Sequence, residues 1–272
     1  MTSVSLFPLA GVVTSIAALM IWKTALGDEP DQQRQGVLAP LVAISIIMTL
    51  IGLILREPIK PEGLYFGLVS GLVTAILLTQ ASYLFGLIRH GIRGLGLILL
   101  PATALPLLVI PFLSDSDATA SWIQTKSPLQ DAHLLISLLA YAVLTLATIH
   151  ALMYLQLNRS LKRKQIGTLL KALPALTEIE KHMYAQILGA VWLLGIGILT
   201  GLTWQWNESA HFHLLTHKTL LAIFSWAVLM TLLIMRKRSN WSGHKGSIMV
   251  IAAYIMLLLA YFGVKFIRLG MN

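Results

Sequence analysis

Two histidines begin long apolar segments of this 272-residue chain. His133 opens the apolar run 133–155, and His217 opens the run 217–235. A neutral imidazole is a common ligand of transition metals and of haem iron. If both runs start at the same face of a membrane, the two imidazoles lie at matching depth. The spacing therefore predicts His133 and His217 as a pair of metal or haem ligands.

The composition indicates an integral membrane protein. Hydrophobic residues make up 57% of the chain and charged residues 11%, and the mean hydropathy is +0.78, values far outside the range of soluble domains. Eight continuous apolar runs have the length that crosses a bilayer: 4–26, 37–55, 64–87, 95–113, 133–155, 185–204, 217–235 and 248–267. We predict an all-α polytopic helix bundle, a single membrane domain over residues 1–272 with eight transmembrane helices.

Basic residues are divided unequally between the two sets of alternating loops. One set holds 14 of the 20 Lys and Arg residues and the opposite set, including the tail, holds 6. By the positive-inside rule, the first set is cytoplasmic and both termini lie outside, in a bacterial inner membrane. The net charge of +9 is spread over short loops beside the spans, which argues against nucleic acid as a partner and for membrane lipid. The absence of cysteine excludes thiolate ligands and thiol redox chemistry.

Other polar and aromatic residues accompany the two histidines. His133, Ser137 and Tyr141 are four residues apart, so they share one helix face, which we expect to point into the bundle. Lys218 could pair with a haem propionate, and Trp204 and Trp206 could lie against the macrocycle. On the residues alone, an alternative stays open, in which the histidines are interfacial and the tryptophans belong to the aromatic belt.

Two features bear on other functions. No Asp, Glu, Lys or Arg lies near the centre of any run, which disfavours an ion-coupled transporter. A run with Pro101, Pro106 and Pro111 is expected to kink and to free backbone carbonyls, so a passive permease is a weaker alternative. The basic segment 158–182 is expected to hold short interfacial helices broken by Pro174, either as a connector that fixes topology or as a partner site.

Three segments of the second half resemble the cytochrome c assembly family, the group of the CcsA, CcmC and HemX-like proteins. They are His133-Leu-Leu-Ile-Ser137-Leu-Leu-Ala-Tyr141, the stretch from Lys218-Thr219 through Ser225-Trp226 to Trp241-Ser-Gly243, and Ala260-Tyr261-Phe262-Gly263-Val264. The resemblance covers about residues 131–267. It implies a membrane protein that binds haem and takes part in cytochrome c biogenesis.

The chain departs from the members of that family that present haem to apocytochrome. Their tryptophan-rich motif ends in Trp-Asp followed by Pro-Lys-Glu-Thr, whereas this chain reads Trp204-Gln-Trp206-Asn-Glu and then Thr216-His217-Lys218-Thr219. Ile234 stands where the CcsA branch has histidine. The pattern is closest to the YpjD-like and HemX-like branch, in which the histidine of this helix corresponds to His217.

The resemblance leads to one main hypothesis and one alternative. In the first, the protein holds haem between His133 and His217, works by ligand exchange rather than as an enzyme, and has partners among other cytochrome c biogenesis or haem-synthesis proteins. In the alternative, it is a haem-free regulatory or scaffolding protein of HemX-like type that acts through the basic segment 158–182.

Overall fold

The computed structural model describes residues 3–26, 32–56, 59–60, 63–66, 68–112, 123–125, 127–164, 167, 173–209, 217–239, 241 and 243–260. The chain forms two compact units. Unit 1 comprises Met1–Asp131 and Ile166–Pro174, and unit 2 comprises Ala132–Gln165 and Ala175–Asn272. The prediction of one domain over residues 1–272 stays a prediction.

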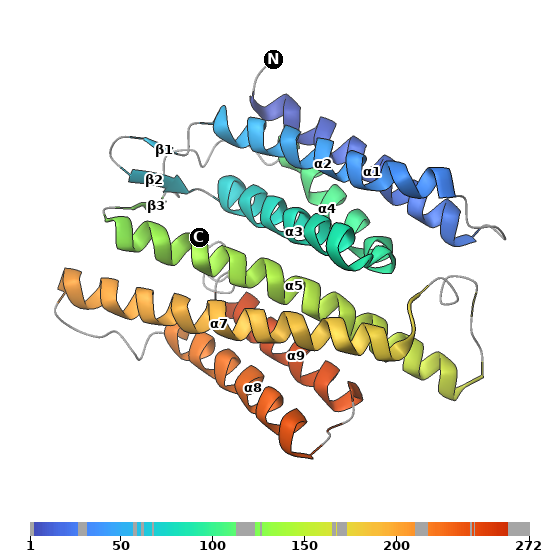
Figure 1. Ribbon diagram of the computed structural model, residues 1–272. Helices are drawn as coiled ribbons and strands as arrows, with labels where there is room; N and C mark the ends of the chain where they lie inside the picture. The colour runs from blue at the N-terminus through green and yellow to red at the C-terminus, as the bar shows by residue number, and fades with distance from the viewer. Residues whose placement is uncertain are drawn as a thin grey trace. The chain divides into compact units, whose positions relative to one another are not determined.

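Unit 1 consists of four helices that lie side by side, and a small sheet (Figure 1). The helices are α1 (Ser3–Leu26), α2 (Gln32–Ile54), α3 (Leu68–His90) and α4 (Gly96–Val109), and 3₁₀ turns η1 (Arg93–Leu95) and η2 (Ile110–Phe112) flank α4. The strands β1 (Ile59–Lys60), β2 (Gly63–Phe66) and β3 (Ile123–Gln124) pair antiparallel in that order. Because β2 takes up Gly63 to Phe66, α3 begins at Leu68, later than the predicted run 64–87.

One proline of α4 frees a backbone carbonyl, as the sequence predicts, whereas Pro111 lies in η2 and the kink stays a prediction. Pro101 has no backbone N–H, so the carbonyl of Leu97, four residues earlier, has no donor within the helix. The indole Nε1–H of Trp22 on α1 donates to that carbonyl at 3.0 Å. A neighbouring helix thus satisfies the backbone group that the proline frees.

A buried polar network joins the four helices of unit 1. Each helix contributes one side chain: Thr14 from α1, Ser45 from α2, Gln80 from α3 and Thr103 from α4, all at most 7% exposed. The hydroxyls of Thr14 and Ser45 are 2.6 Å apart, and the Gln80 amide nitrogen donates to Thr14 at 3.3 Å and to Thr103 at 3.2 Å. Ser45 also donates to Gln80 Oε1 at 3.3 Å. In lipid, such bonds hold helices in register because no water competes for them.

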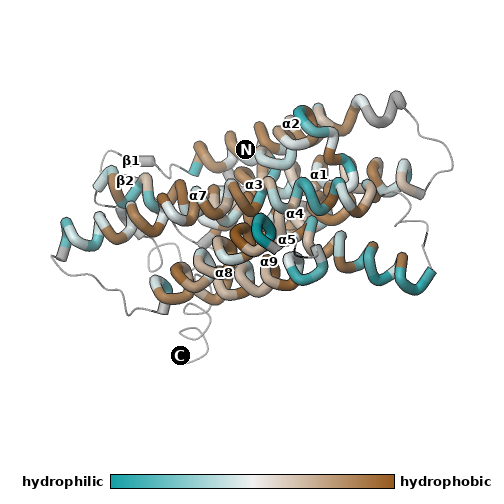
Figure 2. The backbone as a smooth tube through the Cα atoms, turned by 60° about the horizontal axis from the view of Figure 1, so that its bottom comes forward, coloured by the Kyte–Doolittle hydropathy of each residue, from teal (hydrophilic) through white to brown (hydrophobic). Residues whose placement is uncertain are grey.

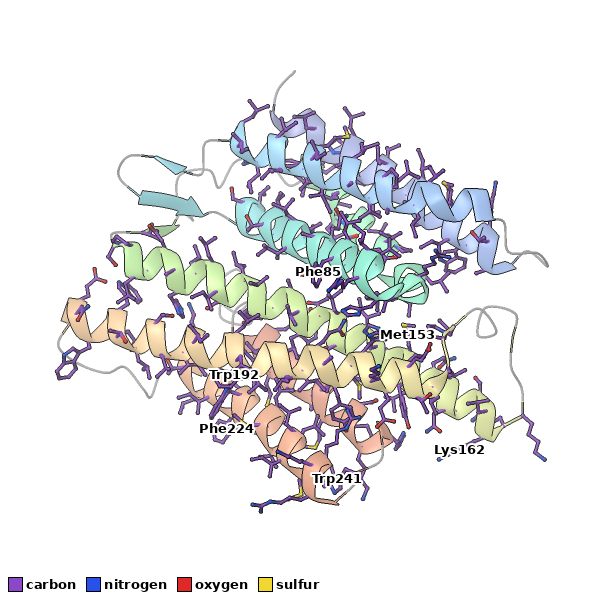
Figure 3. All side chains as sticks on the ribbon, viewed as in Figure 1. Phe85, Met153, Lys162, Trp192, Phe224 and Trp241 are labelled. Carbon is purple, nitrogen blue, oxygen red and sulfur yellow. The ribbon has the colours of Figure 1, made fainter. Side chains whose placement is uncertain are left out.

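Unit 2 is a bundle of four helices. They are α5 (Pro128–Lys162), α7 (Leu176–Ser209), α8 (His217–Ser239) and α9 (Gly243–Leu258). Side chains from all four form one apolar core, which includes Leu144, Ile187, Leu229 and Val250. Large apolar side chains also cover the outside, where Trp192 is 68% and Phe224 61% exposed (Figure 3). That outer surface suits contact with lipid tails rather than water.

Seven helical segments within the described residues are long and apolar enough to cross a membrane. Polar residues gather towards helix ends and apolar residues along the middles (Figure 2). The eighth, α9, is shorter, and residues 261–267 of the predicted last run lie outside the described part of the chain. The all-helical membrane fold is confirmed, apart from the three short strands. The count of eight spans and the outer position of both termini stay predictions.

The basic segment between α5 and α7 differs from its prediction. Helix α5 continues to Lys162 and α7 begins at Leu176, so both ends of segment 158–182 belong to the long helices rather than to separate short ones. Pro174 lies just before α7 and packs against Gly94 of unit 1. The middle of the segment lies largely outside the described residues.

Candidate functional site

His133 lies in the second turn of α5, because the helix begins earlier than the apolar run. Pro128 is the first helical residue, a position that proline favours. Ser127 precedes it, and its hydroxyl accepts a bond from the Gln130 N–H at 3.3 Å, as an N-cap residue does. The capped start explains why α5 begins before the apolar run 133–155.

The face shared by His133, Ser137 and Tyr141 points into unit 2, as the spacing predicts. The Tyr141 hydroxyl donates to the carbonyl of Leu257 on α9 at 2.7 Å. Ser137 lies next to Gly197 of α7, where an added Cβ would meet its hydroxyl oxygen at 3.4 Å. One polar face of α5 therefore contacts two neighbouring helices.

The imidazole of His133 is oriented by a backbone carbonyl. Its Nδ1 is 2.7 Å from the oxygen of Gly197 on α7. A carbonyl oxygen only accepts, so the proton belongs to Nδ1 and the lone pair is on Nε2. Metal-bound histidines have this arrangement, with one ring nitrogen donating to a carbonyl and the other ligating. The half-buried ring of His133 is thus in the tautomer that ligation by Nε2 requires.

Gly201 makes the space in which this ring lies. A Cβ on Gly201 would be 2.7 Å from Cε1 and 2.9 Å from Nδ1 of His133, closer than real Cβ atoms come to other atoms. Gly197 and Gly201 are spaced four apart, which is a common pattern of small residues where membrane helices pack. Their role is more specific, because Gly197 supplies the acceptor and Gly201 the room. Only the contact across the two helices reveals it.

Trp204 shares this face of α7, since it follows Gly197 and Gly201 at helical spacing. Its indole Nε1 is buried and has no hydrogen-bond partner. A buried donor without an acceptor costs about 1–3 kcal/mol, so the position favours an acceptor supplied by a ligand. Trp206, by contrast, is 51% exposed and is not on the His133 side of the helix.

The second predicted ligand lies at the start of α8. His217 is the first residue of that helix, and its side chain lies outside the described ones. Lys218 follows it and is exposed. The start of α5, the end of α7 and the start of α8 lie at one end of unit 2 (Figure 1). The structure therefore brings His133 and Trp204 to the end of the unit at which the His217 backbone lies.

The sequence profile described as "Cytochrome C assembly protein" matches residues 16–272. The chain belongs to the cytochrome c assembly family. The match extends much further towards the N-terminus than the three segments 131–267, so unit 1 is part of the family's fold as well.

Individual relatives of the family agree. The inner membrane protein YpjD of Escherichia coli is 25% identical over 96% of each chain, and protein HemX of Brevibacillus brevis is 26% identical over 58% of each. An uncharacterised 28.8 kDa protein of Azospirillum brasilense is 37% identical over about half of each chain. The apolar helices and these relatives make the chain a multi-pass inner-membrane protein.

Proposed function

We propose that this protein binds haem at the end of unit 2 that carries His133, and that it acts in haem handling during cytochrome c biogenesis. The observation that carries the proposal is the orientation of His133. Its Nδ1–H donates to Gly197, which leaves the Nε2 lone pair for a metal. Family membership supports the choice of iron in a porphyrin over a bare ion.

The residues of this end suit haem in three respects. His133 would supply one neutral nitrogen ligand to the iron, and His217, at the start of α8, is the candidate for a second. The unpartnered Nε1–H of Trp204 can donate to a propionate oxygen, and exposed Lys218 can balance propionate charge. When bound, haem would supply an iron centre whose ligands can be exchanged.

The chain's own residues would bind and release rather than catalyse. The carbonyl of Gly197 holds the His133 ring in one orientation, and Gly201 keeps the ring close to α7. Replacement of one imidazole by a ligand of a partner protein would allow release. We therefore propose no chemical transformation, and partners among other cytochrome c biogenesis or haem-synthesis proteins.

Absorption spectra of the purified protein test the proposal. The protein is expressed with ample haem and purified in mild detergent, with His133→Ala, His217→Ala and, as a control, His244→Ala, which removes an exposed histidine of α9. We expect stoichiometric haem with a bis-histidine spectrum in the wild type and in the control. Either of the other two variants should lose that spectrum while its unfolding midpoint without haem stays the same.

The haem-free alternative makes the opposite prediction. If the protein acts through the basic segment 158–182, replacing Arg163 and Lys164 should abolish function in cells, whereas His133→Ala should not. The match to HemX keeps this alternative in view. A colourless protein that also fails to bind added haem would overturn the haem proposal and favour the alternative.

A further inference from the structure

A second pair of histidines lies further along the same two helices. His150 of α5 is 3% exposed, and the centroid of its ring is 6.0 Å from that of His182 on α7, with the rings tilted by 32°. This pair belongs to unit 2, like His133, but lies towards the opposite ends of α5 and α7. The proposed function does not use it.

The hydrogen bonds of His150 define its tautomer. Its Nδ1 is 3.0 Å from the carbonyl of Leu146 and 2.9 Å from Oε1 of Gln186 on α7. The Leu146 carbonyl can only accept, so the proton is on Nδ1 and the lone pair is on Nε2. The Gln186 side chain is thereby placed with its oxygen towards His150. As at His133, one nitrogen is held by acceptors and the other is in the ligating form.

The facing helix has a matching series of polar groups. Glu178, His182 and Gln186 are each four residues apart on α7, so they share one face. Gln186 contacts His150 directly, and His182 follows one turn away in ring contact. Glu178 lies one further turn along, exposed in the first turn of α7. This face thus offers the imidazole of His182 beside that of His150, with the carboxylate of Glu178 one turn further along α7.

We propose that His150 and His182 bind a first-row divalent transition-metal ion, with Glu178 as a carboxylate ligand and Gln186 as the residue that orients His150. Two imidazoles on one ion, with metal–nitrogen distances of about 2.0–2.1 Å, place their centroids roughly 5–6.5 Å apart. The observed 6.0 Å lies within that range. Within the described ranges no three such side chains are already gathered around one point, so binding requires Glu178 to rotate towards His182.

Close packing favours a bare ion over a second haem at this pair. His150 is almost wholly buried, and Gln186 bridges α5 and α7 directly beside it. A porphyrin between the two rings would have to separate these helices, whereas an ion needs only the space between two nitrogens. Nitrogen and carboxylate ligands suit Cu²⁺, Ni²⁺, Co²⁺ and Zn²⁺. The inference is independent of haem binding at His133.

Metal titration of the purified full chain tests the site. The protein, free of haem and treated with chelator, carries His211→Ala and His213→Ala to remove the imidazoles of the His-Phe-His sequence. Co²⁺ is added while the visible absorption is followed, and Cu²⁺ spectra are recorded by electron paramagnetic resonance to count coordinated nitrogens. The variants are His150→Asn, His182→Ala and Glu178→Gln, with His244→Ala as the control.

His150→Asn is chosen because the asparagine amide can still donate at the position of Nδ1 but has nothing at Nε2. We expect His150→Asn and His182→Ala each to weaken Co²⁺ binding at least about tenfold, with one coordinated nitrogen fewer. Glu178→Gln should weaken it less, and His244→Ala should leave it unchanged. Unfolding midpoints without metal check that the variants fold. If His150→Asn does not fold, His182→Ala alone tests the proposal. Equal affinities for wild type, His150→Asn and His182→Ala would overturn the proposal, as would an equal loss in the control.

Discussion

The polar network of unit 1 and the His133 end of unit 2 are both polar regions of a membrane protein, yet they differ in how their groups are satisfied. In the network, Thr14, Ser45, Gln80 and Thr103 bond one another or backbone carbonyls of α1 and α4. At the His133 end, one nitrogen of the imidazole keeps a lone pair, and the Trp204 indole lacks an acceptor.

This difference in hydrogen bonding distinguishes a region that packs helices together from a region that can bind a ligand. A network whose members satisfy one another lowers the energy of the folded helices and has nothing left to offer a ligand. A region with an oriented lone pair and an unused donor gives up stability that a ligand can restore. Substitutions in the network should therefore reduce stability and leave haem binding intact, whereas substitutions around His133 should reduce haem binding.

The largest effect is expected for Gly201→Ala. The new methyl group would lie 2.7 Å from Cε1 of His133, so the ring must leave its place beside α7, and we expect loss of the bis-histidine spectrum and about 1–3 kcal/mol of overpacking strain. Gly189→Ala is the matched control on the same helix, because its Cβ would meet only Val143, at 3.7 Å. Haem spectra and unfolding in mixed detergent micelles measure both effects. A wild-type spectrum in Gly201→Ala would contradict the proposed position of the His133 ring beside Gly201.

Gln80→Leu should have the next largest effect, on stability alone. It removes the side chain that bonds Thr14 and Thr103, and since an interhelical bond in a membrane contributes about 0.6–1.7 kcal/mol, we expect a loss of roughly 1–2 kcal/mol with the haem spectrum unchanged. Thr79→Val is the control, because the Thr79 hydroxyl bonds only within its own helix, to Ala75. If Gln80→Leu folded fully but bound less haem, the proposed distinction between the two regions would be wrong.

Trp22→Phe should have the smallest effect. It leaves the Leu97 carbonyl without its donor while keeping an aromatic ring, at a cost of about 1 kcal/mol. The comparison is sharpened by Trp226→Phe in unit 2, which removes an equivalent bond, 3.0 Å long, to the Val191 carbonyl. Unfolding midpoints of the two variants should fall by similar amounts. An unchanged midpoint in Trp22→Phe would show that water or another group replaces the indole.

Features set by local spacing could be predicted from the sequence. Continuous apolar runs predict helices because lipid leaves backbone groups no other partner, and their positions agree with the helices found. The inward face of His133, Ser137 and Tyr141 follows from their four-residue spacing. The consequence of Pro101 is equally local, since the missing N–H identifies the Leu97 carbonyl as the group in need of a donor.

Features that depend on how helices are rotated against one another could not be predicted. Serine and threonine are common in membrane helices, so nothing marked Thr14 or Ser45 before the four helices met. Gly201 differs from other glycines only through its contact with His133. The ends of α5 and α7 were missed for another reason, because hydropathy reports the width of the apolar layer and not how far good helix formers such as Leu161 continue the helix beyond it.

The bond between Trp22 and the Leu97 carbonyl couples residue 22 to residue 101. Pro101 lacks the backbone N–H that would otherwise donate to this carbonyl. The indole is needed because residue 101 is proline, and the proline is tolerated because an indole is near. Relatives with another residue at position 101 have a backbone donor of their own for that carbonyl and no such demand on position 22. Among relatives, we therefore expect tryptophan at position 22 to co-vary with proline at position 101, which couples the sequences of α1 and α4.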